Sequence, residues 1–223
     1  MGRPQLYRVV AAALVGTGVL GISVWLNADR TGANASIKPT YDKATGRLTE
    51  LAYDSNHDGR PDTWTEMDGT RPLRSRVDLN EDGKIDRWEE YDEKGGLSRV
   101  GFSRSDSGKA DAWAISGADG KVDHIEISST GDVRRINRWE YYDASQSGPD
   151  GRAGLVRAEE DTTGDGKPDK WETYENGMIK TVAFDESGHG RPDRRLTYLS
   201  SGRAAIESDP DASGRFAKRV ETR

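Results

Sequence analysis

Short apolar runs recur along this chain, and polar turns that contain glycine separate them. One kind of run opens with tryptophan, as in Trp88 to Tyr91, and a second run with strand-like composition, such as Leu97 to Phe102, follows after a turn. Runs of roughly four to eight residues, rich in aromatic and β-branched side chains and bounded by Gly, Asn and Asp, are typical of β-hairpins. No stretch beyond the N-terminal apolar segment shows a helical period.

The turns that follow every second run repeat one phrase. Asp-x-Asn-x-Asp-Gly-x-x-Asp-x-Trp occupies residues 54–64 and 78–88, and residues 161–171 repeat it with threonine at the third position. The period is about 24 residues, and each unit is a strand, a tight turn, a strand and an acidic loop. The pattern therefore predicts an all-β fold of tandem hairpin repeats, arranged as an antiparallel meander whose sheet is curled or superhelical.

Aromatic residues are expected on both faces of this sheet. Trp88 and Tyr91 lie three residues apart, as do Trp171 and Tyr174. Because successive side chains of a strand point to opposite faces, each tryptophan should lie on the face opposite its tyrosine. Either the sheet curls and packs one face inside, or one face is offered to a partner.

Composition limits how thick the core can be. Hydrophobic residues make up 33% of the chain and charged residues 32%, which is lean for a thick globular core. There is no cysteine, so disulfides and thiolate metal sites are excluded. The net charge of −6 and the pI near 5.3 argue against nucleic acid as a partner.

The amino terminus differs from the rest of the chain. Val9 to Leu26 carry no charge, and at roughly 1.5 Å per residue this run approaches the thickness of a bilayer core. Arg3 and Arg8 precede it, so the positive-inside rule places the N-terminus in the cytoplasm of a bacterium. We therefore predict a cytoplasmic N-terminus at residues 1–8, an inner-membrane anchor (or uncleaved signal) at 9–28, a linker at 29–40, and a periplasmic or extracellular β-repeat domain at 41–223.

Two further features of this segment bear on the prediction. A cleaved secretory signal is the alternative, with Ala33-Asn34-Ala35 as a small-x-small site that lies far beyond the apolar run. One face of the predicted helix carries Ala13, Thr17 and Gly21, and small residues at this spacing let membrane helices approach closely. The face predicts packing against another membrane protein subunit, although Ala and Gly are also common in anchors that pack against nothing.

The repeated acidic loops have the chemistry of a calcium site. Calcium takes six to eight oxygen ligands, and a glycine allows a turn sharp enough to aim several oxygens at one point. Turn formers such as Asp, Asn and Gly also bond the local backbone, but that explanation covers only one or two residues per turn. Oxygen side chains at positions 1, 3, 5 and 9, with glycine at position 6, therefore favour bound Ca²⁺.

The nine-residue loop resembles the calcium loops of integrin-type and VCBS-type bacterial β repeats. It is also similar to the first half of an EF-hand loop, although no flanking helices are evident, and the stretch at 41–48 weakly resembles bacterial YD-type repeats. The first resemblance implies that position 7 adds a backbone carbonyl to the side-chain oxygens of positions 1, 3, 5 and 9. The predicted metal ligands are Asp54, Asn56, Asp58, Arg60 and Asp62; Asp78, Asn80, Asp82, Lys84 and Asp86; and Asp161, Thr163, Asp165, Lys167 and Asp169. Weaker versions of the loop lie at 103–111, 185–193 and 209–217.

No catalytic motif is evident. The chain has no nucleophile elbow, phosphate loop or dinucleotide fingerprint, and its three histidines hold three different repeat positions. The Trp-Glu pairs at 88–89, 139–140 and 171–172 can suggest a sugar platform with a carboxylate acid. Because the pairs recur at the repeat period, cross-strand packing with solvated glutamates is the simpler interpretation. We therefore expect a chain that is not an enzyme and has no catalytic residues.

These features together predict a membrane-anchored, calcium-binding β-repeat protein. We expect an interaction or scaffold subunit that binds other membrane protein subunits through the anchor and the repeat surface, as an accessory part of a photosynthetic or respiratory assembly, for example. A surface adhesin or glycan-binding module that uses exposed tryptophans is the alternative, and a secreted hydrolase is a third.

Overall fold

The computed structural model describes residues 36–132, 134–147, 153–199 and 202–222. They form fifteen β-strands and no α-helix. The strands are β1 (Ile37–Tyr41), β2 (Leu48–Tyr53), β3 (Thr63–Asp68), β4 (Arg71–Val77), β5 (Arg87–Tyr91), β6 (Leu97–Phe102), β7 (Ala112–Ser116), β8 (Val122–Ile127), β9 (Arg138–Ser147), β10 (Ala153–Glu160), β11 (Lys170–Glu175), β12 (Met178–Phe184), β13 (Arg194–Tyr198), β14 (Ala204–Pro210) and β15 (Phe216–Glu221). The predicted all-β antiparallel meander is confirmed.

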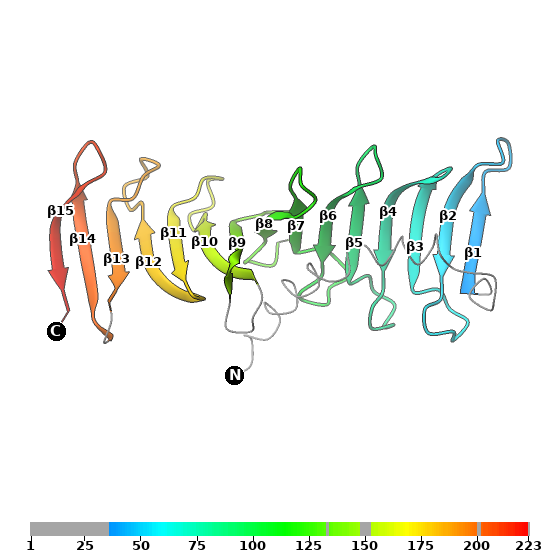
Figure 1. Ribbon diagram of the computed structural model, residues 1–223, viewed down its shortest axis with the longest axis horizontal. Coiled ribbons are helices and arrows are strands. Elements are labelled where there is room, and N and C mark those ends of the chain that lie inside the picture. Colours follow the sequence, from blue (N-terminus) through cyan, green and yellow to red (C-terminus); the bar gives the residue numbers. More distant parts are fainter. Residues whose placement is uncertain (1–35, 133, 148–152, 200–201, 223) are drawn as a thin grey trace. The chain divides into compact units, whose positions relative to one another are not determined.

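The chain divides into two compact units, residues 1–123 and 124–223. In the first unit each of the strands β1 to β6 pairs antiparallel with the next strand in the sequence. In the second unit the strands up to β15 follow the same rule. Figure 1 shows this up-and-down path, with long loops and tight turns alternating along the chain.

The prediction that the sheet curls on itself is wrong for each unit. Strand order follows the sequence, and no pairing among the described residues joins two strands that are distant in the chain. A sheet needs to curl or pair with a second layer when one face is largely apolar. Here both faces carry ion pairs and aromatic side chains, so neither face is apolar enough to require a second layer over it. Each unit is an open sheet.

The core is thin and consists mainly of small residues. Val100, Ala112 and Ala114 are buried in the first unit, and Ile125, Ile127 and Ala158 in the second. Alanine becomes buried in a single sheet when larger side chains on the neighbouring strands close over it. This arrangement agrees with the low hydrophobic content of the chain.

Gly101 and Trp113 form a cross-strand pair in the first unit. They lie directly opposite each other on β6 and β7, and a Cβ on Gly101 would come within 2.9 Å of the indole ring. The ring therefore lies flat over the glycine backbone. Arg99 stacks on the same ring, with its guanidinium carbon 4.3 Å from the ring centroid.

Replacing Gly101 by alanine should destabilise the first unit by about 1–2 kcal/mol, because the added methyl group displaces the Trp113 ring. Urea unfolding followed by tryptophan fluorescence measures this loss. The same substitution made together with Trp113→Ala should cost much less, since the clashing ring is gone. An equal loss in both backgrounds would show that the contact with the ring is not the cause.

Candidate functional site

The acidic loops connect β2 to β3, β4 to β5 and β10 to β11, and the loop residues are numbered here from the first aspartate. At position 1, the Asp54 carboxylate accepts the backbone amides of His57 at 2.7 Å and Gly59 at 2.8 Å. The Asp161 carboxylate accepts the amides of Gly164 and Gly166 in the same way. Position 1 therefore holds the inner amides of the loop.

Position 9 fastens the start of the loop to its end. The Asp62 carboxylate accepts the amide of Ser55 at 2.7 Å, and Asp86 accepts that of Leu79 at 2.8 Å. Asp169 accepts the amide of Thr163 at 2.9 Å. Because positions 1 and 9 also sit at the ends of two paired strands, these contacts close the loop into a compact unit.

Positions 3 and 5 make short local hydrogen bonds. The side chain of Asn56 accepts the amide of Asp58 at 2.9 Å, and Asp58 accepts that of Arg60 at 2.8 Å. The same bonds recur in the other loops. The side chain of Asn80 accepts the amide of Asp82, that of Asp82 accepts the amide of Lys84, and that of Asp165 accepts the amide of Lys167. Thr163 at position 3 of its loop instead donates its hydroxyl to Asp161 at 3.4 Å. Local hydrogen bonding thus involves each repeated oxygen residue and accounts for more of the motif than the sequence alone indicates.

Backbone conformation explains the glycine. Position 6 has a positive φ in the three loops, with 93° at Gly59, 87° at Gly83 and 90° at Gly166. This left-handed conformation is costly for residues with a side chain, so glycine is required there. Position 4 is also left-handed, and His57 and Glu81 tolerate it at φ values of 67° and 61°.

Neighbouring loops of the first unit are joined to one another. The amide of Asp78 donates to the carbonyl of Asp62 at 2.9 Å, which links the end of one loop to the start of the next. The side chain of Asn56 donates to Glu81 at 2.6 Å across the same boundary. The predicted ligands of each loop therefore gather within their own loop, and the loops form a row along one end of the strands.

The weaker predicted loops differ in outcome. Asp185 accepts the amides of Gly188 at 2.7 Å and His189 at 3.1 Å, so the loop at 185–193 has the same architecture. The loop predicted at 209–217 is wrong, because Asp209 belongs to β14 and pairs with Lys218. The turn there begins at Asp211, and the connection from β14 to β15 is shorter than the nine-residue loops.

The fit of these loops to calcium is uneven. Among the described residues no group of three or more His, Asp or Glu side chains is arranged to hold a metal ion. Asp78 is only 8% exposed, and its Oδ1 atom is buried without a hydrogen-bond partner. A buried carboxylate oxygen of this kind suits a cation, so the loop at 78–86 fits best. Lys84 lies 2.9 Å from Asp82 and already supplies one positive charge there.

The loop at 161–169 carries a cation from its neighbour, which the sequence analysis missed. The Arg135 guanidinium lies 3.9 Å from the buried carboxylate of Asp161. A Cβ on Gly164 would fall 1.6 Å from Arg135 Nη2, so the arginine occupies the space that a side chain at position 4 would need. The glycine at position 4 was the available signal, because the two other loops have His57 and Glu81 there.

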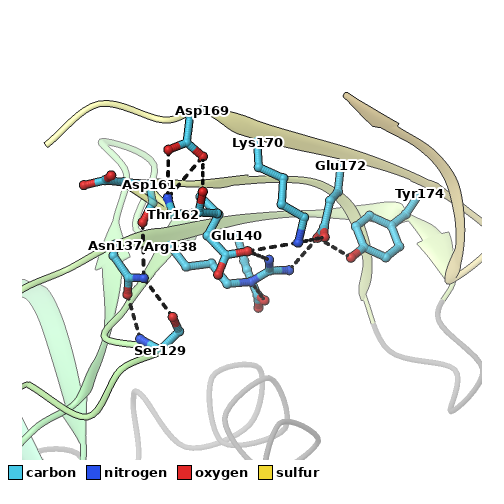
Figure 2. A network of polar contacts seen from close by, with 11 residues as sticks. Ser129, Asn137, Arg138, Glu140, Asp161, Thr162, Asp169, Lys170, Glu172 and Tyr174 are labelled. Carbon is cyan, nitrogen blue, oxygen red and sulfur yellow. Dashed lines mark hydrogen bonds and ion pairs between the residues drawn. The ribbon is translucent and has the colours of Figure 1, made fainter. Parts of the chain in front are cut away.

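The second unit contains a network of buried charges on β9, β10 and β11 (Figure 2). The Arg138 guanidinium lies 2.8 Å from Glu140, 3.3 Å from Glu160 and 2.8 Å from Glu172. Lys170 bridges two of the same carboxylates, at 3.1 Å from Glu160 and 2.8 Å from Glu172. Two cations thus hold three carboxylates together across three strands.

Tyrosines complete this network. Tyr142 donates its hydroxyl to Glu140 at 2.7 Å, and Tyr174 donates to Glu172 at 2.7 Å. A related group occurs in the first unit, where Arg87 lies 2.6 Å from Glu89 and Tyr91 donates to the same carboxylate. Each group comes from alternate residues of one strand in the pattern Arg/Lys-Trp-Glu-x-Tyr, so cation, carboxylate and phenol share a face while the tryptophan lies on the other.

The Trp-Glu pairs are therefore not what the sequence suggested. Glu140 and Glu172 are buried rather than solvated. The spacing of a cation two residues before the glutamate and a tyrosine two residues after it was the signal available in the sequence. The tryptophan between cation and glutamate interrupts this pattern, because it lies on the opposite face.

The pKa values show how firmly these charges are held. Burial raises the pKa of Glu172, but hydrogen bonds from Lys170, Tyr174 and Arg138 outweigh it and lower the pKa to about 2. Burial and the neighbouring Glu172 raise the pKa of Tyr174 above its ordinary value. Catalytic acids and bases need pKa values close to the working pH. These shifts move the pKa values of Glu172 and Tyr174 away from neutral pH, so the network suits structural support better than proton transfer.

Acid should weaken the second unit in a defined pH window. The lowered pKa of Glu172 means that its stabilising effect is complete above about pH 4.5, its ordinary pKa, and is lost as the pH falls towards 2. We expect the melting temperature of the wild-type chain to fall steeply across that window and that of Glu172→Gln to fall less. Glu175→Gln, on the same strand but exposed, should behave like the wild type. Identical pH profiles for all three chains would contradict this prediction.

The face opposite the network in each unit carries the tryptophans. In the first unit Trp64, Arg76, Trp88, Gly101 and Trp113 lie directly opposite one another on successive strands. The three indoles are half-buried and occur on every second strand, which spaces them by roughly 9.6 Å. We call these five residues the tryptophan row.

Charges beside the tryptophan row are paired. Arg74 lies 2.6 Å from Glu66, and Arg99 lies 2.8 Å from Glu90. These residues share the face of the row, because they are two positions away from its members on the same strands. The surface therefore combines half-exposed aromatic rings with neutralised ion pairs.

Comparisons with known proteins assign no family. No protein-family model and no curated protein matches this chain. Among the 26 matching solved chains is the glycosyltransferase TarM of S. aureus, described as a G117R mutant in complex with fondaparinux, α-GlcNAc-glycerol and UDP. The identity is 13% and the TM-score 0.35, over 55% of this chain and 22% of that chain.

The TarM match bears on the prediction that this chain is not an enzyme. Because the matching chain is an enzyme, the exclusion of an enzymatic activity is corrected and withdrawn. A TM-score this low assigns no fold or activity to the present chain, which covers less than a quarter of the other. The resemblance to calcium loops is not tested by any comparison and stays a prediction.

The predicted anchor lies outside the described residues, as do Ala13, Thr17 and Gly21. In the part of the chain that the structure describes, no helix is long and apolar enough to cross a membrane. The predicted localisation and topology thus remain expectations from the sequence.

Proposed function

We propose that this chain is a membrane-anchored β-repeat protein whose tryptophan row binds another subunit of a larger membrane assembly. The observation that carries the proposal is the row itself, with Trp64, Trp88 and Trp113 half-exposed on one face of an open sheet. Tryptophan and arginine are the residues that most often dominate the binding energy of protein interfaces. Paired charges beside the row suit a partner surface because little desolvation of unpaired charge is needed.

The buried ion networks support this role indirectly. An open sheet with a thin core needs other means to hold its strands in register. The network around Arg138 in the second unit and the group around Arg87 in the first join neighbouring positions with charge-assisted hydrogen bonds. A sheet made rigid in this way presents its aromatic side chains at constant spacing.

Capture of partners from native membranes tests the proposal. The full chain, tagged and extracted in mild detergent, should co-purify with a defined membrane complex. Trp88→Ala should lose the complex, while Leu79→Ala, which alters an exposed loop residue away from the row, should retain it. A wild-type chain that purifies alone, or equal retention by both variants, would count against the proposal.

Glycan binding is a second candidate because of the spacing of the indoles. Every second strand places a tryptophan roughly 9.6 Å from the next, close to the repeat of an extended β-1,4-linked disaccharide. Aromatic rings at that spacing can stack on successive sugars of an extended chain. A glycan array probed with the wild type and with Trp64→Ala would show selective binding of neutral β-linked polymers if this candidate is correct.

We also propose that the loop at 78–86 binds calcium, on the strength of the buried, unpartnered Oδ1 of Asp78. Extracellular modules bind calcium with dissociation constants of about 1 mM, so about 10 mM calcium should stabilise the chain by roughly 1.4 kcal/mol per site. Thermal melts in calcium and in chelator measure the shift. Asp78→Asn should reduce it, whereas Asp68→Asn, in β3 and outside the loops, should not. A melting temperature that is unchanged by calcium would contradict the proposal.

A further inference from the structure

Among the strands that the structure describes, β15 pairs on one side only, with β14. The amide of Thr222 donates to the carbonyl of Ala204 at 2.8 Å, which shows that the even-numbered residues of β15 bond to β14. Because residues alternate in an antiparallel ladder, the N–H and C=O groups of Ala217, Arg219 and Glu221 point away from β14. Among the described strands none pairs with this edge.

An apolar row leads to the same edge. Val182, Leu196, Ile206 and Val220 lie directly opposite one another on β12 to β15. Exposure rises along the row, from 7% at Val182 to 41% at Ile206 and 66% at Val220. The row therefore ends on an exposed valine that lacks the apolar neighbour its predecessors have.

The first unit protects its own edge differently. β1 carries Lys38 and Pro39, and proline and lysine are common devices that prevent an edge strand from pairing with another chain. β15 has no proline, and the Lys218 ammonium is held by Asp209. The edge of β15 is thus the less protected of the two.

We propose that β15 pairs with β15 of a second copy of this chain, antiparallel and about a two-fold axis. In the favoured register Val220 faces Val220 of the second copy, which joins the two apolar rows. Arg219 then faces Glu221 of the second copy, and Glu221 faces its Arg219. This inference is independent of the function proposed for the tryptophan row, which lies in the other unit.

Charge and hydrogen bonding select this register over its neighbours. Arg219 and Glu221 point to one face, have half-exposed side chains, and lie on the residues whose backbone groups are directed outward. Shifting the pairing by two residues would bring Arg219 against Arg219 of the second copy, which like-charge repulsion disfavours. A shift by one residue would place the apolar row on opposite faces of the two copies. The register that pairs opposite charges is also the one that continues the apolar row.

Cysteine cross-linking tests the contact in the full chain in mild detergent. The chain has no cysteine, so Val220→Cys introduces a single thiol. Facing residues of a non-hydrogen-bonded pair have Cα atoms about 4.5 Å apart, a separation that permits a disulfide. Mild oxidation should convert most Val220→Cys to a covalent dimer, while Met178→Cys, with a similarly exposed site at 70%, should stay mostly monomeric. Equal cross-linking of the two variants would overturn the proposal.

Charge exchange tests the register. Arg219→Glu and Glu221→Arg should each reduce dimer formation at least tenfold, because each places like charges opposite one another. An equal mixture of the two variants should restore dimers, since every facing pair is again of opposite charge. Sedimentation velocity gives the mass, and thermal melts confirm that both variants are folded. Monomeric wild type, or a mixture that remains monomeric, would overturn the proposal.

Discussion

Replacement of Arg138 by leucine should lower the free energy of unfolding of the second unit by about 3–5 kcal/mol. Arg138 lies within 3.3 Å of three buried or half-buried carboxylates, Glu140, Glu160 and Glu172. Without it, Lys170 alone faces three negative charges in a poorly hydrated place. Repulsion among those charges and the loss of their hydrogen bonds both favour the unfolded chain.

Urea unfolding and hydrogen exchange measure the effect of Arg138→Leu together. We expect a lower unfolding midpoint and faster exchange of the amides in β9, β10 and β11. Arg74→Leu is the matched control, because Arg74 also pairs with a cross-strand glutamate but is largely exposed, and its loss should cost less than about 1 kcal/mol. If the two variants were equally stable, the network would not contribute as proposed.

Asp54→Ala should destabilise the first unit by about 2–3 kcal/mol, both with calcium and with chelator. The Asp54 side chain is buried and accepts the amides of His57 and Gly59, and it shares the amide of Asp58 with Asn56. Leaving such donors without a partner costs about 1–3 kcal/mol for each one that water does not reach. Water reaches some of these amides in the opened loop, which limits the total.

Two variants separate the amide contacts from metal binding. Asp58→Ala removes an exposed carboxylate that accepts the amide of Arg60 and, among the described residues, no other, so the loss of stability in chelator should be below about 1 kcal/mol. Asp54→Asn keeps one side-chain oxygen and should recover part of the lost stability. A loss for Asp54→Ala that appears only in calcium would show that the metal, rather than the amide contacts, holds the loop.

The fold was predictable to the level of the meander but not to the shape of the sheet. Repeated runs of aromatic and β-branched residues between Gly- and Asp-rich turns predict consecutive antiparallel strands, because such hairpins form from local contacts. Curling depends on which face must be buried. The sequence pattern does not show which side chains of each face are buried. Glu140 and Glu172 look like solvent-facing residues in the sequence, but they are buried and form ion pairs with Arg138.

Some features of the candidate site were likewise predictable from the sequence, and others were not. The repeat identified the loop residues whose side chains accept the loop amides, including Asp54, Asp62 and Asp78, but it suggested metal coordination as the cause. The only sequence signal for Arg135 beside Asp161 was the glycine at position 4, which does not identify the partner, because the two residues belong to different loops. The tryptophan row was expected as aromatic side chains on one face, while its alternation with Arg76 and Gly101 depends on strand register.

The sequence alone determined the period, the strand and loop positions, the residues that need a left-handed backbone and the separation of tryptophan from tyrosine. All of these follow from the conformation of single residues and their near neighbours along the chain. Only the tertiary structure decided that each sheet stays open, that charges meet across three strands and that no described strand pairs with the outer edge of β15. Those features depend on which distant residues become opposite neighbours, and a shift of one residue in pairing would change every one of them.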